Sequence, residues 1–216
     1  MICFTKYRIG WAWLLFFISE LSAQEKSPVF LELEGGVERF SDAPLRSVFP
    51  GGINLTLGPA FSVADQGRLR LRPQTGIKLF FNELDEWTTE HLRVIRLGGQ
   101  ASYDAFFVGQ TTFFPYFAID FNWVANYDAE SAAAGDGERV SFSDNYLKGS
   151  GISQALGLRM QYREFYVKLG YEFFYPRLKV EKKVMNDDVA AGYITPTSYP
   201  FNFNVINLSL GIILEL

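Results

Sequence analysis

INLSLGIILEL, residues 206–216, is the stretch that decides the fold class of this 216-residue chain. Its apolar side chains fall on every second residue, and smaller or polar residues lie between them at positions 207, 209, 211 and 215. Successive side chains of a β-strand point to opposite faces of a sheet. The spacing therefore predicts a strand with one apolar face and one polar face.

Seven earlier segments repeat this period of two, at residues 31–38, 53–62, 68–81, 91–103, 113–123, 152–161 and 165–173. The segment at 91–103 is the least regular, because Gly98 and Gly99 interrupt its alternation. A ten-strand count, which adds residues 140–142 and the segment near Leu178, leaves strands too short for a membrane wall. Eight strands with little helical pattern between them predict an all-β, antiparallel sheet of consecutive hairpins.

The composition bounds the class of protein. Hydrophobic residues make up 48% of the chain, enough to bury a sizeable apolar surface, and the net charge of −4 provides no basic surface for nucleic acid. A single cysteine, Cys3, excludes a disulfide framework, and a single histidine, His91, excludes any site that needs two imidazoles.

The first 23 residues have the three parts of a secretory signal peptide. Lys6 and Arg8 supply the positive part, residues 9–18 are apolar, and small residues precede the expected cut after Ala23. An uncleaved membrane anchor is the alternative, but an apolar run of about ten residues is shorter than the ~20 needed to span. We therefore predict a signal peptide at residues 1–23 and a β-barrel domain at residues 24–216.

Two architectures can use alternating strands. A soluble exported β-sandwich buries one face of each sheet on a core. A transmembrane barrel needs strands of about ten residues and an aromatic, apolar outer face, as these segments have. Backbone groups in lipid must all be paired within the protein, so a spanning sheet has to close on itself. The sequence thus favours an eight-stranded up-and-down transmembrane β-barrel, with a soluble periplasmic β-protein as the structural alternative.

The connections between the segments alternate in length, which orients the predicted barrel. The expected outward loops are residues 41–50, 82–90, 128–149 and 176–200, while the inward turns include residues 64–67 and the tight pair Arg163-Glu164. Long extracellular loops and short periplasmic turns are typical of outer-membrane barrels. Leu178, Val180 and Val184 indicate that the last hairpin extends as strand beyond the membrane.

The last residues also carry a family likeness. Ser209, Gly211, Leu214 and Leu216 match the terminal-strand signal by which the assembly machinery recognises bacterial outer-membrane proteins, although Leu216 stands where that family most often has an aromatic residue. Together with the signal peptide and eight strands, the chain resembles the small OmpA/OmpX-like barrels of the porin-like outer-membrane β-barrel family. The resemblance implies location in the outer membrane, with its lipid and its assembly machinery as partners, and brings no catalytic residues.

Strand parity predicts that many charged side chains share the barrel interior. They are Glu32, Glu34, Glu38, Arg68, Arg70, Arg72, Lys78, Asp120, Arg159, Lys168, Glu172 and Glu215. Eight strands enclose an interior that side chains nearly fill, and buried charges persist when they are paired. We therefore favour a polar plug, with a narrow solute channel as the alternative.

Other chemistry has weaker support. His91 beside Glu90 suggests an outer-leaflet lipid-modifying enzyme, but no motif with a nucleophilic serine accompanies it. Asp128, Glu130, Asp136 and Glu138 lack the ordered spacing of a calcium loop. The prediction is a non-enzymatic envelope protein without cofactor or nucleic acid, whose outer loops contact an extracellular or envelope partner that the sequence does not name.

Overall fold

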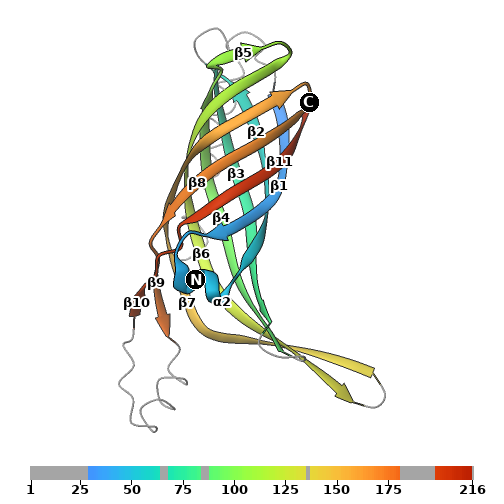
Figure 1. Cartoon of the computed structure of the whole chain (residues 1–216), viewed down its shortest axis with the longest axis vertical. Coiled ribbons are helices and arrows are strands. Elements are labelled where there is room, and N and C mark those ends of the chain that lie inside the picture. The colour runs from blue at the N-terminus through green and yellow to red at the C-terminus, as the bar shows by residue number, and fades with distance from the viewer. Residues whose placement is uncertain (1–28, 64–67, 84–87, 135–136, 181–197, 216) are drawn as a thin grey trace, which may run out of the picture.

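A closed antiparallel barrel dominates the computed structural model, which describes residues 29–63, 68–83, 88–134, 137–180 and 198–215 (Figure 1). Eight strands form the wall: β1 (Val29–Phe40), β2 (Gly51–Ser62), β3 (Leu69–Glu83), β4 (Thr88–Tyr103), β6 (Thr111–Ala134), β7 (Gly137–Tyr162), β8 (Phe165–Phe174) and β11 (Val205–Glu215). Short strands β5 (Phe106–Val108), β9 (Arg177–Val180) and β10 (Ser198–Pro200) extend the hairpins, and helix α2 (Ala43–Val48) follows β1.

Pairing of the first wall strand with the last closes the ring. β1 runs antiparallel to β11 from Phe30 opposite Glu215 to Phe40 opposite Val205, and to β2 along its other edge. The order β1-β2-β3-β4-β6-β7-β8-β11 returns to β1, so each wall strand has two antiparallel partners. The predicted eight-stranded up-and-down barrel is confirmed, and the open sandwich is excluded.

The outer surface of the wall is apolar. Side chains that alternation assigned to one face point outward and are exposed, among them Ile152 (64%) and Leu210 (66%). Exposed apolar side chains occur on every wall strand, while the positions between them are buried inside. A closed ring with this outer face is the construction of barrels that span bacterial outer membranes.

No helix in the described residues is both long enough and apolar enough to cross a membrane.

The two ends of the barrel differ in their connections. At one end, where the C-terminus and β5 lie in Figure 1, β7 and β8 join through Arg163 and Glu164. Arg163 adopts a positive φ of 55°, which a turn of two residues requires. At the other end, the β1–β2 and β8–β11 connections are long, and the β6–β7 hairpin extends past the barrel. The rule that outer-membrane barrels have their short turns at the periplasm predicts that the end with the C-terminus faces the periplasm.

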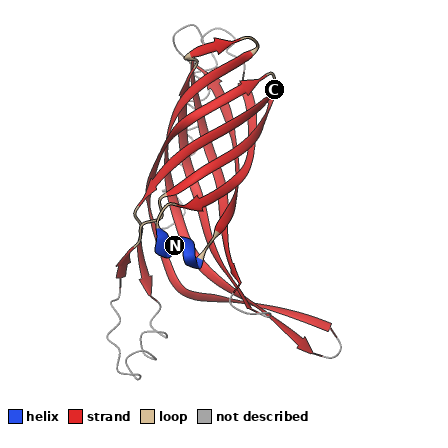
Figure 2. Cartoon of the chain, in the orientation of Figure 1, coloured by secondary structure: helices blue, strands red, loops and turns tan. Residues whose placement is uncertain are grey.

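Residues 128–149, expected as an outward loop, belong largely to strands. β6 and β7 pair from Thr111 opposite Tyr162 to Ala134 opposite Gly137, with an irregularity between Ala125 and Tyr127. Beyond that irregularity they form a long ribbon that projects past the barrel in Figures 1 and 2. β9 extends the last hairpin, as Leu178 and Val180 indicated, whereas Val184 lies outside the described residues.

The connection at residues 41–50 contains the short helix α2, coloured blue in Figure 2. Pro44 stands at its start, where a missing backbone N–H costs nothing. The N–H of Arg46 donates to the carbonyl of Asp42, and the N–H of Phe49 donates to that of Leu45. The helix thereby turns the chain back toward the barrel mouth and aims Phe49 inward.

Arginine at the outward position Leu208 tests the lipid-facing wall. We expect Leu208→Arg to lower the free energy of unfolding by ~2–4 kcal/mol, because a charge near the bilayer midplane is desolvated. Leu214→Arg, close to the periplasmic end of β11, should cost only ~0–1 kcal/mol. Urea unfolding in lipid vesicles, read by the mobility of unboiled protein on a gel, gives both values. Equal costs at the two positions would contradict the membrane placement.

Candidate functional site: the barrel interior

Ten buried charged side chains lie in the middle and periplasmic part of the interior. Five are acidic and five are basic among the described residues: Glu32, Glu34, Glu38, Asp120 and Glu172, with Arg72, Lys78, Arg96, Arg159 and Lys168. We call these ten residues the ionic layer. Its formal charges cancel, so each buried charge has an opposite charge available.

The periplasmic half of the ionic layer is organised around two glutamates of β1. Both carboxylate oxygens of Glu32 accept from Nη1 of Arg159, at 2.8 and 2.9 Å. Glu34 accepts from Arg72 at 3.0 Å and forms an ion pair with Lys168 at 2.5 Å. Arg72 also lies 3.3 Å from Glu32 and joins the two pairs into one network. Strands far apart in the chain are thus tied through the lumen.

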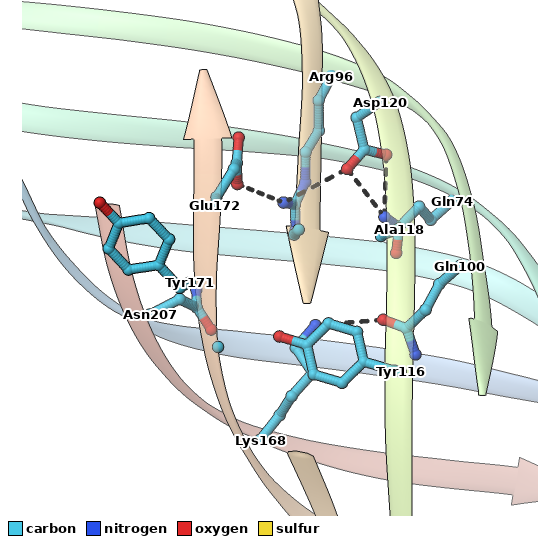
Figure 3. Close-up of a pocket in the computed structure, with 12 residues that line it drawn as sticks. Gln74, Arg96, Gln100, Tyr116, Ala118, Asp120, Lys168, Tyr171, Glu172 and Asn207 are labelled. Atoms are coloured by element: carbon cyan, nitrogen blue, oxygen red, sulfur yellow. Dashed lines mark hydrogen bonds and ion pairs between the residues drawn. The ribbon is translucent and has the colours of Figure 1, made fainter. Parts of the chain in front are cut away.

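The other half of the layer is built on Lys78 and Arg96. The Lys78 amino group lies 3.1 Å from Glu38 and 2.5 Å from Glu172. Arg96 lies between Glu172 and Asp120, at 3.9 and 4.0 Å, as Figure 3 shows. Polar side chains complete the network, since Gln74 donates to Asp120 at 2.9 Å and Asn207 donates to Glu38 at 3.0 Å.

A small polar cavity remains beside Arg96, lined also by Gln74, Gln100, Tyr116 and Lys168 (Figure 3). Its volume is about 20 Å³, room for roughly one water molecule. That volume is far smaller than a passage for solutes would need, so the side chains of the ionic layer nearly fill the space around Arg96.

The outer end of the interior is apolar. Ten buried side chains gather there, which we call the apolar cap: Phe40, Phe49, Phe80, Leu92, Val94, Val124, Phe174, Leu178, Phe203 and Val205. The rings of Phe40 and Phe80 stack at 4.3 Å, and Phe203 lies 5.5 Å from Phe40. Phe49, placed by α2, and Phe203, whose N–H donates to the Phe174 carbonyl at 2.8 Å, reach in from the connections. The cap covers the ionic layer on the outer side.

Three predicted members of the charge network lie at its periplasmic margin instead. Arg68 donates to the carbonyl of Asp104 at 2.9 Å, and Arg70 donates to Gln161 at 3.1 Å and lies 3.9 Å from the Asp104 carboxylate. Burial raises the pKa of that carboxyl, and the charge of Arg70 opposes the shift. Glu215 is exposed at the end of β11, so its expected place among the buried pairs was wrong.

Sequence reasoning missed Arg96 and the aromatic residues of the interior. Arg96 has the same parity as Gln100, but Gly98 and Gly99 obscured the pattern, although both glycines stay in register with β3 and β6. The Arg159 guanidinium lies over the Tyr166 ring, 3.8 Å from its centroid, and the Tyr166 hydroxyl donates to Glu34 at 3.2 Å. The signal for the apolar cap was also present, because Phe40 and Phe80 follow Glu38 and Lys78 at the interior parity.

The four residues of the terminal-strand signal have different places. Ser209 is buried inside and Leu214 is exposed outside, while Leu216 lies outside the described residues. A Cβ on Gly211 would collide with the ring of Tyr166 on the neighbouring strand. Gly211 therefore has a packing role in this barrel, and recognition by the assembly machinery stays a prediction.

The residues considered for catalysis and metal binding do not form a site in the described part of the chain. His91 lies on β4 with its ring edge-on to Phe81, 5.2 Å between centroids. No group of three His, Cys, Asp or Glu side chains there could hold a metal ion. Asp136 lies outside the described residues, as do the side chains of Glu90, Asp128, Glu130 and Glu138.

Comparison with known proteins gives structural likenesses only. No protein-family model matches the sequence, and no curated protein does. A major outer membrane protein of Thermus thermophilus aligns at 12% identity over 86% of this chain and 99% of its own, with a TM-score of 0.47. Neisserial surface protein A aligns at 15% identity over 87% and 97%, with a TM-score of 0.44. Ail of Yersinia pestis aligns at 7% identity over 88% and 97%, with a TM-score of 0.41. The architecture of this chain rests on its own strand pairing, and these likenesses assign it no function.

Removing Lys78 tests the ionic layer. Lys78→Met leaves Glu38 and Glu172 without their shared cation, and we expect a loss of ~3–5 kcal/mol in unfolding free energy. Arg70→Met, at the partly exposed margin, should cost ~1 kcal/mol or less. The double change Glu38→Gln and Lys78→Met should recover much of the loss, since it leaves four buried acidic and four buried basic side chains, with Glu172 still 3.9 Å from Arg96. Urea titration in vesicles measures all three, and equal losses for Lys78→Met and Arg70→Met would contradict the network.

Proposed function

We propose that this chain is a non-enzymatic, integral protein of the bacterial outer membrane, closed to solutes, that holds the β6–β7 ribbon at the cell surface. The apolar cap over a neutral ionic layer is the observation that carries the proposal. A conducting pore needs a continuous polar path, and here the outer end of the interior is filled by stacked phenylalanines.

The charge balance also argues against a selective channel. Ion-selective pores line their constriction with an excess of one sign. Here five buried acidic and five buried basic side chains pair within the described interior. The chain therefore uses these charges to hold its wall strands in register, and the narrow solute channel becomes an outcome that the conductance experiment would reveal.

The ribbon supplies the surface role. β6 has 24 residues and β7 has 26, about twice the 12 residues of β2. At 3.2–3.4 Å per residue, strands of this length reach well beyond a hydrocarbon core of ~30 Å. The backbone of the ribbon is paired strand to strand and is continuous with the closed barrel, and a preformed binding element costs less entropy to use than a loop that must first be ordered. We infer that its partner is extracellular or in the envelope, while lipid and the assembly machinery contact the wall.

Planar bilayers test the closed interior. The purified barrel should give no steady conductance steps, because both layers of its interior are filled. A general porin added to the same bilayer provides the positive control for insertion and detection. Discrete steps from the wild-type chain that change when Arg72→Gln is introduced would overturn the proposal in favour of a narrow channel.

Surface labelling tests the orientation. The only cysteine, Cys3, lies in the predicted signal peptide, so one new cysteine can report its own location. Ala133→Cys, near the ribbon tip, should react with a membrane-impermeant maleimide on intact cells. Glu164→Cys, in the two-residue turn, should react only after the outer membrane is permeabilised. The reverse result would place the ribbon in the periplasm and exclude the surface role.

A further inference from the structure

The outward face of the wall is hollowed at one place, across β3, β4 and β6. An open groove of about 410 Å³ lies there, lined mainly by apolar atoms of Leu71, Pro73, Gly99, Ala101, Phe117 and Ile119. Its volume falls in the ~300–1,000 Å³ range of small-ligand sites. Because the outer face of this wall meets hydrocarbon, the groove opens toward lipid and not toward water.

Strand register explains why the surface dips. Gly99 stands between Pro73 and Ile119 on the neighbouring strands, and Ala101 stands between Leu71 and Phe117. The central strand β4 thus contributes only small side chains to these two rows. Its flanks carry Leu71, Phe117 and Ile119, which are 38%, 44% and 47% exposed. The result is a groove along β4, with bulky side chains of β3 and β6 on its two sides and only small side chains at its base.

The guanidinium of Arg68 lies beyond the periplasmic end of this groove. Tyr103 is the next outward residue of β4 after Ala101, and the Arg68 guanidinium lies over its ring, 4.9 Å from the centroid. At about 3.3 Å per residue, Gly99 is within about 13 Å of Tyr103. Half of a ~30 Å hydrocarbon core is ~15 Å, so the groove has the depth of the periplasmic leaflet and Arg68 the depth of its headgroups.

We propose that this groove and Arg68 together bind one phospholipid of the periplasmic leaflet. One acyl chain lies over Gly99 and Ala101, and the phosphate accepts a charge-assisted hydrogen bond from Arg68. Bulk lipid is as apolar as the groove, so burial alone gives no selectivity here. Selectivity comes instead from the shape of the groove along β4 and from the Arg68 guanidinium at its end. This inference rests on the orientation in the proposed function.

Matched glycines test the groove. A Cβ on Gly99 or on Gly35, which faces outward on β1, meets no atom closer than 3.7 Å. Gly99→Leu fills the groove, while Gly35→Leu adds the same side chain elsewhere on the outer face of the wall. Native mass spectrometry of protein purified in mild detergent should find one phospholipid retained per wild-type chain. Retention should fall at least tenfold in Gly99→Leu and stay unchanged in Gly35→Leu.

Matched arginines test the headgroup contact. Arg68→Gln should lower retention about tenfold, the loss expected for one hydrogen bond to a charged group. Arg39→Gln, at an outward position near the opposite end of β1, should leave retention unchanged. The inference is overturned if the wild-type chain retains no phospholipid or if all variants retain it equally. It is also overturned if the spectrum shows the mass of a dimer that is lost only in Gly99→Leu. The last result would assign the groove to a second copy.

The outcomes stay separable from those of the proposed function. If phospholipid is retained and is lost in Gly99→Leu and Arg68→Gln, but surface labelling shows the reverse orientation, the groove still binds lipid, whereas its assignment to the periplasmic leaflet fails together with the surface role. If labelling and conductance agree with the proposal but no phospholipid is retained, only the lipid site fails.

Discussion

Backbone hydrogen bonding in a medium without water is the constraint on which this structure depends. Every N–H and C=O facing lipid needs a partner in the protein, and a sheet meets that need only by closing. The β1–β11 pairing performs the closure here. Once eight strands are joined, the interior is so narrow that side chains must fill it, and their chemistry then decides what the barrel can do.

The interior meets this demand in two ways that support each other. Along β1, β3 and β8, charged residues give way to Phe40, Phe80 and Phe174 at the next interior position toward the outside. The cap keeps water away from the ion pairs, which strengthens their attraction. The pairs in turn stabilise one register of the wall, because a shift by one residue would move every charge into lipid.

Much of this architecture is readable from alternation alone. The eight wall strands, their facing and the burial of Glu32, Glu34 and Glu38 follow from the period of two, since lipid outside and a packed lumen inside impose opposite chemistry. The ribbon beyond Ala125 was not predictable in this way. Its two strands satisfy each other, so the alanine-rich stretch at residues 129–134 needs no apolar face. The apolar cap could not be predicted from charge alternation alone, because it consists of apolar residues at interior positions. Phe40 and Phe80 stand two positions after the buried charges Glu38 and Lys78, so they share the inward face of their strands.

The long sequence separation of the interior ion pairs has a consequence for the order of assembly. Glu32 and Arg159 are 127 positions apart, and Glu34 and Lys168 are 134 apart. A hairpin of β1 and β2 entering lipid alone would expose its glutamates to hydrocarbon, at ~2.5–3.5 kcal/mol for each charge. Insertion therefore has to await synthesis of the last third of the chain. Contacts of such high sequence separation also form slowly. The polypeptide consequently depends on chaperones that keep it unfolded in the periplasm until its last strands have been exported.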